Sequence, residues 1–226
     1  MIDESVEWLA QLRELDTCVI SDALDALDLP GVVADLTRLS GDTPIVGRAV
    51  TVELVPAGEG PATPARRHLA TAAVATSGPD EVIVVSHPGL PCAGWGGLLT
   101  KAASLRGIAG TLVDGPVRDV DESRALDYPI HARSATPTTA RGRLVENSWG
   151  EPVSFAGVTV DTGDLVRADG SGIVFIPFHR AQEVIERAGA FAAREAAMSA
   201  ALETGEAITT VMDTSYEVLA GKGIHS

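Results

Sequence analysis

The chain has 226 residues, of which 45% are hydrophobic, and this is enough for one domain with a buried core. Its 31 acidic and 17 basic residues give a formal net charge of −14, which repels nucleic-acid backbones and anionic lipid headgroups, so neither nucleic acid nor membrane is expected as a partner. The N-terminus lacks a signal-peptide pattern and no apolar run approaches the roughly 20 residues that cross a bilayer, so we expect a cytoplasmic protein.

The first third of the chain predicts helices around one long strand. Asp16 or Thr17 can cap a helix that continues to about Asp28, where Leu29-Pro30-Gly31 stops it. Further on, β-branched residues predict the strand Ile45–Val55, and a run of alanines predicts the helix Pro64–Thr76.

The middle of the chain repeats a pattern of strand, loop and helix. Such alternation is typical of mainly parallel strands, and ligands bind beyond the carboxyl ends of these strands. The predicted elements are the strand Glu81–Ser86, loop His87–Gly96, helix Gly97–Arg106, strand Ala109–Val113, loop Asp114–Val117, helix Asp119–Leu126 and strand Pro129–Arg133. We therefore expect functional residues in the two loops.

After Arg141 the pattern changes to short strands separated by Gly-Asp turns, which favours antiparallel pairing. A long helix follows, from about Arg180 to Leu202. The fold class is therefore α/β, with a parallel βαβ core, short antiparallel strands and a C-terminal helix. We predict a single domain over residues 1–226, with N-terminal helices in 1–30 and a C-terminal helix and tail in 180–226 as extensions. The predicted short strands are Val153–Phe155, Val158–Val160, Leu165–Ala168 and Ile173–Ile176.

A glycine-rich loop, Gly94-Trp95-Gly96-Gly97-Leu98-Leu99, leads into the helix that begins at Gly97. The first backbone N–H groups of a helix have no intrahelical partner, and together with the helix dipole they favour an anion such as a carboxylate. A glycine-rich turn that only lets helix and strand pack closely explains the loop equally well. The loop is neither a dinucleotide-binding nor a P-loop fingerprint, which disfavours nucleotide chemistry.

A second motif, Val113-Asp114-Gly115-Pro116-Val117-Arg118-Asp119, lies where the next strand gives way to a helix. Arg118 offers a planar fork to a carboxylate or to a developing enolate, and Asp119 offers hard oxygen ligands to Mg²⁺ or Mn²⁺. Alternatively, Asp119 only caps the helix and Arg118 is its exposed neighbour. Because both loops follow neighbouring parallel strands, we expect an anion site, an arginine and a metal-binding aspartate to converge.

Together the two motifs, continued by Val120-Asp121, resemble the RraA-like family, which includes the 4-hydroxy-4-methyl-2-oxoglutarate aldolases. The segment from Val113 to Asp119 is the most specific part of the resemblance. The similarity covers most of the chain, because it extends to Ile20-Ser21-Asp22-Ala23-Leu24, to Val46-Gly47-Arg48-Ala49-Val50-Thr51, to Gly163-Asp164-Leu165 and to Gly172-Ile173-Val174-Phe175-Ile176-Pro177.

The resemblance implies a β/β/α swivelling-domain fold, assembled as a homotrimer or hexamer with sites between subunits. It implies a class II-like aldolase that uses Mg²⁺ or Mn²⁺ to cleave a C–C bond of a small 2-oxo acid through an enolate, and that also decarboxylates oxaloacetate. Asp119 would be the metal ligand, and Arg118 would contact the oxo acid. The substrate-binding segment would be Gly96, Gly97, Leu98 and Leu99, with the backbone amides of the two leucines on the carboxylate.

The chain departs from the aldolases at Gly97, where they carry an acid that orients metal-bound water for proton transfer. This departure affects the expected aldol substrate more than metal or pyruvate binding. Glu195 can supply part of the missing function, because it falls on the apolar stripe of the C-terminal helix, and the family places a C-terminal glutamate of a neighbouring subunit near the metal waters. The alternative for Glu195 is an ion pair at the helix interface.

Other polar residues near the two motifs are interpreted as structural. Cys92 has no evident base partner and is expected to be reduced, and His87 is expected to be a hydrogen-bonded structural residue rather than a pocket residue. Asp114 is expected to cap a turn with Gly115. The densest basic cluster, Arg66-Arg67-His68, is interpreted as a solvated helix face.

Two other functions are compatible with the family resemblance. Some members are non-catalytic regulators that bind an endoribonuclease, but these lack the aspartate after the arginine, so Asp119 favours an enzyme. A methyltransferase of menaquinone synthesis is disfavoured because no glycine-rich S-adenosylmethionine loop is evident. The sequence leaves open the natural oxo acid, since the far end of the substrate would be selected by loops such as 56–64 and 134–150. It also leaves open the physiological metal, and trimer against hexamer.

Overall fold

The computed structural model describes residues 4–60 and 68–212. Its strands are β1 (Val32–Val33), β2 (Thr37–Ser40), β3 (Ile45–Pro56), β4 (Glu81–Ser86), β5 (Gly110–Val117), β6 (Ile130–Ala135), β7 (Leu144–Trp149), β8 (Val153–Phe155), β9 (Val158–Val160), β10 (Leu165–Ala168) and β11 (Ile173–Ile176). In this part of the chain, nine of them form one mixed sheet in the order β1-β11-β10-β3-β4-β5-β6-β2, with β7 added to β3, and β8 and β9 form a separate hairpin. The expected α/β class is confirmed.

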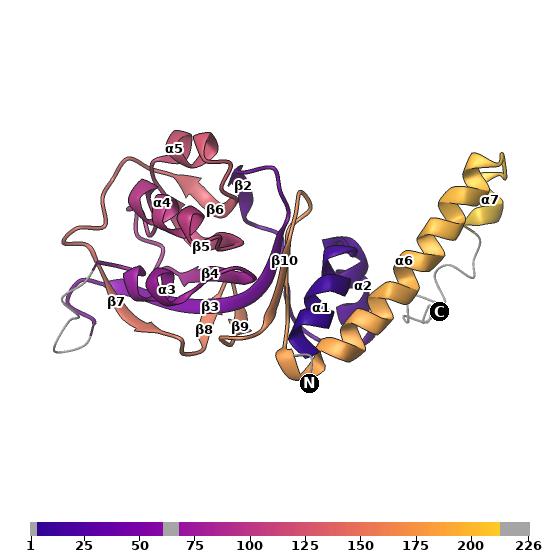
Figure 1. Ribbon diagram of the computed structural model, residues 1–226, viewed down its shortest axis with the longest axis horizontal. Helices are drawn as coiled ribbons and strands as arrows, with labels where there is room; N and C mark the ends of the chain where they lie inside the picture. Colours follow the sequence, from indigo (N-terminus) through magenta and orange to yellow (C-terminus); the bar gives the residue numbers. More distant parts are fainter. Residues whose placement is uncertain (1–3, 61–67, 213–226) are drawn as a thin grey trace, which may run out of the picture.

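The centre of the sheet is parallel, as the alternating pattern predicted. β3 pairs with β4, β4 with β5 and β5 with β6, all in parallel. The helices α3 (Thr71–Thr76), α4 (Gly97–Leu105) and α5 (Val120–Ala125) connect these strands, and α4 packs against both others. Figure 1 shows the three helices together, away from the terminal helices. The loops after β4 and β5 therefore meet at one edge of the sheet.

The later short strands pair antiparallel, which confirms the second part of the predicted fold. β10 lies between β3 and β11 and is antiparallel to both, and Val166 of β10 is opposite Gly47 of β3. A side chain at position 47 would come within 2.7 Å of the Asp80 carbonyl oxygen, so the close approach of β3 to the turn just before β4 requires glycine.

Terminal helices cover the far side of β10 (Figure 1). They are α1 (Glu4–Arg13), α2 (Thr17–Ala26) and α6 (Ala181–Glu203), the last followed by α7 (Ile208–Val211). Asp16 caps α2, because its side chain accepts hydrogen bonds from the backbone N–H of Cys18 and of Val19 at 2.9 and 3.0 Å. The apolar stripe of α6 is buried against this cluster as far as Ala188 and partly as far as Ala192. Beyond that point α6 extends away from the body.

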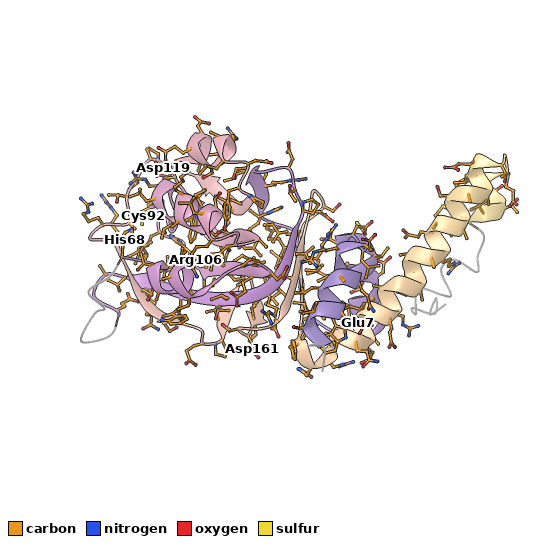
Figure 2. The ribbon with its side chains drawn as sticks, in the orientation of Figure 1. Glu7, His68, Cys92, Arg106, Asp119 and Asp161 are labelled. Carbon is orange, nitrogen blue, oxygen red and sulfur yellow. The ribbon has the colours of Figure 1, made fainter. Side chains whose placement is uncertain are left out.

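The terminal helices lie on the opposite side of the molecule from the loops that follow β4 and β5. Figure 2 shows Glu7 of α1 on the side of the terminal helices, and His68, Cys92 and Asp119 on the opposite side of the sheet body. Among the described helices, none is both long enough and apolar enough to span a membrane.

The predicted helix Pro64–Thr76 is wrong at residues 68–70, is confirmed from Thr71 onward, and at 64–67 lies outside the described residues. Ala70 prevents an earlier start, because it has a left-handed backbone with φ 58° and donates its N–H to Oε2 of Glu146 at 2.7 Å. Alanine content predicted a helix here, but a long-range hydrogen bond to β7 fixes a turn.

The predicted loop Asp114–Val117 is also wrong, because β5 continues through it to Val117. The Asp-Gly-Pro sequence indicated a turn, yet β5 only shifts register against β6 between Val113 and Pro116, as at a β-bulge. The strands β1, β2 and β7 were not predicted; β1 and β2 are short, and β7 pairs with only one strand, β3.

A buried hydrogen-bond chain fixes α4 against α5. The indole Nε1 of Trp95 donates to Oγ1 of Thr100 at 2.9 Å, and Thr100 Oγ1 lies 3.2 Å from Oγ of Ser123. Ser123 in turn donates its hydroxyl to the carbonyl oxygen of Asp119 at 3.2 Å. Thr100 and Ser123 are fully buried, so these polar groups depend on one another for partners.

We expect Thr100→Val to destabilise the fold by roughly 1–3 kcal/mol, because the isosteric change leaves the buried indole N–H without an acceptor. The measurement is urea-induced unfolding of both variants. The matched control is Thr76→Val on the exposed face of α3, where the free energy of unfolding should change by less than about 0.5 kcal/mol. Equal stability of Thr100→Val and wild type would contradict the structural role of this chain.

Candidate active site

The glycine-rich loop hydrogen-bonds alongside the end of β5. Gly94 donates its N–H to the carbonyl oxygen of Pro116 at 2.9 Å, and Arg118 donates its N–H to the carbonyl oxygen of Trp95 at 3.0 Å. Trp95 and Val117 form a parallel bridge between these hydrogen bonds. The two motifs singled out in the sequence are therefore held side by side, as expected.

Asp119 has a strained backbone at the start of α5. Its φ of 57° and ψ of 39° are left-handed, which is uncommon for a residue other than glycine. Asp119 occupies the N-cap position of α5, as the alternative interpretation expected, but its side chain makes no cap bond to that helix. Its Oδ2 instead accepts the N–H of Gly97, the first residue of α4, at 2.9 Å. The carboxylate therefore connects the end of β5 to the start of α4.

Arg118 lies against the same carboxylate. Its Nε is 3.3 Å from Oδ1 and 3.1 Å from Oδ2 of Asp119, and the two side chains are 40% and 28% exposed. The remaining guanidinium nitrogens therefore stay available to a ligand. In the described residues, the N–H groups of Leu98 and Leu99 have no acceptor, as expected for the first turn of a helix.

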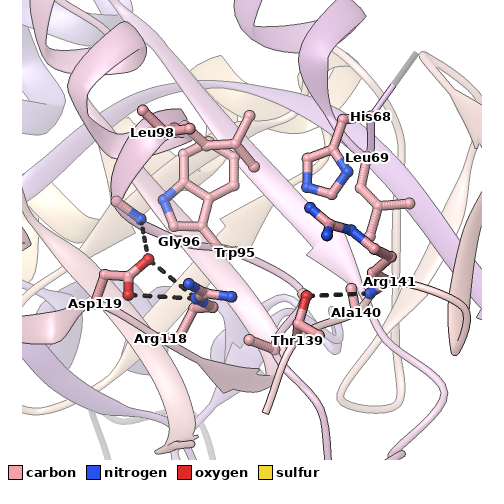
Figure 3. A pocket seen from close by; sticks show the side chains of 14 residues that line it. His68, Leu69, Trp95, Gly96, Leu98, Arg118, Asp119, Thr139, Ala140 and Arg141 are labelled. Atoms are coloured by element: carbon pink, nitrogen blue, oxygen red, sulfur yellow. Dashed lines mark hydrogen bonds and ion pairs between the residues drawn. The ribbon is translucent and has the colours of Figure 1, made fainter. Parts of the chain in front are cut away.

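A pocket of about 210 Å³ lies between these groups (Figure 3). Its lining includes Gly96, Gly97, Leu98, Leu99, Arg118 and Asp119, which are all the predicted site residues except one. The exception is Glu195, which is exposed on α6 beyond β10 and does not line the pocket of its own chain. Its predicted contribution to a neighbouring subunit stays a prediction.

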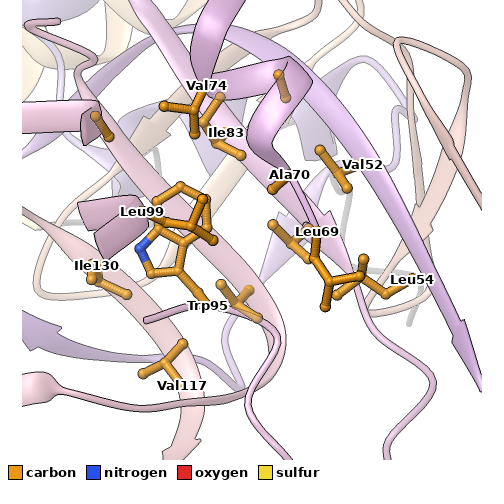
Figure 4. Packing of buried hydrophobic residues seen from close by; sticks show 14 of the residues in the cluster. Val52, Leu54, Leu69, Ala70, Val74, Ile83, Trp95, Leu99, Val117 and Ile130 are labelled. Atoms are coloured by element: carbon orange, nitrogen blue, oxygen red, sulfur yellow. The ribbon is translucent and has the colours of Figure 1, made fainter. Parts of the chain in front are cut away.

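Apolar side chains form the inner wall of the pocket. Leu69, Trp95 and Leu99 are buried in the same cluster as Val117, and Figure 4 shows them packed together. Leu98 differs, because it is 90% exposed at the pocket mouth. A rigid wall under the first turn of α4 fixes the directions of the amide groups that face the pocket.

Glu122 lies beside Gly97 although outside the pocket lining, and the sequence analysis missed it. A side chain at Gly97 would collide with Oε2 of Glu122 and would lie 3.1 Å from Cβ of Asp119. Glycine at position 97 therefore leaves room for a carboxylate that reaches over from α5. The signal was present in the sequence as an acid one helical turn after Asp119, a spacing that puts both on one side of the helix.

His68, Thr139 and Arg141 were also missed as pocket residues. The basic cluster was expected on a solvated helix face, but His68 precedes α3 and lines the pocket, whereas Arg66 and Arg67 lie outside the described residues. No local pattern marks these residues, because they come from two segments that meet only in the fold.

The other candidates are structural. His87 is buried, accepts the Gly89 N–H at Nδ1 and donates from Nε2 to the Cys92 carbonyl oxygen, and burial lowers its pKa, as a neutral structural histidine requires. Burial also raises the pKa of the Cys92 thiol, which disfavours a nucleophilic role. Asp114 does not cap a turn: its carboxylate pairs with Arg133 and accepts the Ala156 N–H at 2.8 Å.

The donor set of the site suits a hard cation that keeps most of its waters. In the described residues, no group of three or more His, Cys, Asp or Glu is placed to hold a metal. Asp119 and Glu122 are the carboxylates that lie against Gly97. One or two carboxylates plus water are typical of Mg²⁺, and of Mn²⁺ among the transition metals, but not of Zn²⁺.

Comparison with known proteins agrees with this architecture. A family model described as RraA-like, Aldolase/RraA, matches residues 17–175. A protein of Halalkalibacterium halodurans with the provisional name 4-hydroxy-4-methyl-2-oxoglutarate aldolase is 32% identical over 83% of this chain and 85% of its own length. Protein DlpA of Legionella pneumophila is 33% identical over 95% of this chain, which spans only 35% of DlpA.

Solved structures agree as well. An uncharacterized protein from Pseudomonas syringae superposes with a TM-score of 0.81 and 30% identity, covering 91% of this chain and 96% of that one. The Streptomyces coelicolor protein RraAS2, described as an unusual member of the RNase ES inhibitor RraA protein family, superposes with a TM-score of 0.72 and 27% identity, covering 84% and 92%.

Proposed function

The chain belongs to the RraA-like family, and on that premise we propose that it is a divalent-metal-dependent lyase that cleaves a C–C bond of a small 2-oxo acid. The substrates proposed are 4-hydroxy-4-methyl-2-oxoglutarate, by aldol cleavage, and oxaloacetate, by decarboxylation. One observation carries the proposal. The Asp119 carboxylate, the Arg118 guanidinium and the unpartnered amides of α4 all face one pocket.

Substrate binding follows from the hydrogen-bonding capacity of these groups. The N–H groups of Leu98 and Leu99 point out of the first turn of α4 and bind the 1-carboxylate, which the helix dipole also favours. Arg118 binds the 2-oxo oxygen or the carboxylate beside it through the guanidinium nitrogens that Asp119 leaves available. The buried Trp95 and Leu99 exclude water from the inner side.

Bond cleavage moves an electron pair onto the 2-oxo oxygen. In the aldol substrate a proton leaves the 4-hydroxyl group, the C3–C4 bond breaks, C4 becomes a carbonyl and the C2 oxygen gains enolate charge; protonation at C3 then yields pyruvate. In oxaloacetate the same bond breaks with loss of CO₂. Arg118 stabilises the developing charge. A Mg²⁺ or Mn²⁺ ion held by Asp119 would supply a Lewis acid at that oxygen.

Glu122 is the residue that we infer holds or moves the proton. Its carboxylate fills the space beside Gly97, where the related aldolases carry their acid. The carboxylate of Glu122 on α5 thus takes the place of an acidic side chain at position 97 of α4. This assignment gives the aldol reaction a proton-transfer group despite the glycine.

A homo-oligomer, trimer or hexamer, is proposed as the functional unit. The outer part of α6 and α7 carries partly exposed apolar side chains, Leu202, Ile208 and Met212, at 40%, 53% and 47% exposure. Such side chains on an extended helix suit contact with another subunit. Glu195, on this part of α6, is the candidate to reach a neighbouring pocket.

The alternative is a non-catalytic regulator that binds an endoribonuclease. It is supported by the likeness to RraAS2, which is described as an unusual member of the RNase ES inhibitor RraA protein family. Against it stands Asp119, which the regulators of the family lack. The two functions differ in whether the pocket turns over a 2-oxo acid.

We expect Asp119→Ala to lower pyruvate release by about 10²-fold or more, on the scale of losing one electrostatic stabiliser. Release from 4-hydroxy-4-methyl-2-oxoglutarate and from oxaloacetate is measured with Mg²⁺, with Mn²⁺ and with chelator, after subtracting the enzyme-free rate. Asp121→Ala is the control, because the Asp121 side chain is 97% exposed. Failure of the folded wild type to release pyruvate from either compound would contradict the lyase and favour the regulator.

Glu122→Gln is expected to lower turnover by about 10²-fold, since proton transfer by a positioned side chain contributes about 10²–10⁴-fold. Mn²⁺ binding, followed by electron paramagnetic resonance, should weaken far less than in Asp119→Ala. Asp121→Asn removes the same charge one residue away and should leave turnover unchanged. The double variant Gly97→Asp, Glu122→Gln should recover part of the activity. Full turnover in Glu122→Gln would exclude the assignment.

Glu195→Gln and Asp119→Ala are each expected to have strongly reduced turnover, yet to complement each other when the two proteins are mixed under conditions that exchange subunits. Mixed oligomers then contain some pockets with both native residues. Recovery of a measurable fraction of wild-type activity would support a site between subunits. Wild-type turnover by Glu195→Gln alone, or no recovery in oligomers shown to be mixed by mass spectrometry, would contradict it.

A further inference from the structure

We propose that Arg141 and His68 form a second anion subsite, which binds the far carboxylate of a dicarboxylic 2-oxo acid. This inference rests on the proposed function and deepens it, because it assigns the substrate class to particular residues. Arg141 lies in the loop before β7 and His68 in the segment before α3, and both line the pocket that contains Arg118 and Asp119. Figure 3 shows the Arg141 guanidinium beside the His68 imidazole, across the pocket from Arg118.

Arg141 has no side-chain partner among the described residues. In the described part of the chain, its guanidinium makes no hydrogen bond or ion pair, and its backbone N–H is the group that bonds, to Oγ1 of Thr139. The other described arginines each have a hydrogen bond, an ion pair, a ring contact or another electrostatic contact. A guanidinium stays charged at any physiological pH and matches the planar geometry of a carboxylate.

Hydrogen bonds within the loop fix the backbone on which Arg141 lies. Arg143, two residues later, donates from Nη1 to the carbonyl oxygen of Thr139 at 3.0 Å, and the N–H of Arg143 bonds to the carbonyl oxygen of Ala140 at 2.8 Å. These bonds close a tight turn around Arg141. Ala140 is buried in the core cluster beneath, so the turn is anchored to the pocket wall.

The two ends of the pocket therefore differ in chemistry. The α4 amides and Arg118 suit the 2-oxo carboxylate, and Asp119 limits the net positive charge at that end. At the other end Arg141 and His68 present donors without a described carboxylate to neutralise them. A monocarboxylic 2-oxo acid would leave Arg141 without a partner, whereas a dicarboxylic one satisfies both ends.

The test compares binding of two unreactive probes, 2-oxoglutarate and 2-oxopentanoate, which have the same chain length and differ in the far carboxylate. Isothermal titration calorimetry with Mg²⁺ should give about tenfold or more tighter binding of 2-oxoglutarate to the wild type. Arg141→Gln should remove most of this preference and leave 2-oxopentanoate binding unchanged, and His68→Gln should reduce it by a smaller factor.

Lys101→Gln is the matched control, because Lys101 is exposed on α4, lies outside the pocket lining and carries the same charge. The preference should persist in this variant. Equal binding of both acids by the wild type, or equal losses in Arg141→Gln and Lys101→Gln, would overturn the subsite while leaving the proposed lyase intact. Binding of neither acid would overturn the proposed function itself. Thermal unfolding midpoints are measured for all three variants to check that each is folded.

Discussion

The hydrogen bond from the Gly97 N–H to the Asp119 carboxylate is the interaction on which the site depends. It joins the first residue of α4 to the residue that follows β5, so the first turn of α4 and the candidate metal ligand cannot move independently. Asp119 reaches it only from a left-handed backbone. That conformation costs of order 1 kcal/mol, and it is held by the bonds of Ser123 N–H and Oγ to the Asp119 carbonyl oxygen.

The same constraint explains why glycine is found at position 97. With the Asp119 carboxylate against the backbone, the remaining space beside α4 takes either a side chain from position 97 or the carboxylate of Glu122. This chain has the second arrangement. Glycine at position 97 therefore leaves a carboxylate beside the start of α4, although that carboxylate comes from another helix.

The sequence was informative where the signal was local. The parallel order of β3 to β6 followed from alternating patterns, and the convergence of the two motifs followed from strand order alone. It was uninformative where distant segments decide. The continuation of β5 depends on Trp95, and the start of α3 depends on Glu146. His68 and Arg141 line one pocket although about 70 residues separate them in the chain. None of these contacts leaves a periodic pattern.

Electrostatics sets a further condition on the pocket. A net charge of −14 opposes the approach of a dianion, and salt screens that repulsion beyond about 8 Å at physiological ionic strength. Attraction therefore has to come from groups that contact the ligand, and in the described residues these are Arg118, Arg141, His68 and the amides of α4. Asp119 is the carboxylate in the pocket lining, and pairing it with Arg118 keeps it from repelling the substrate. A bound divalent cation would shift the same balance further toward anions, so metal and substrate are expected to favour each other's binding.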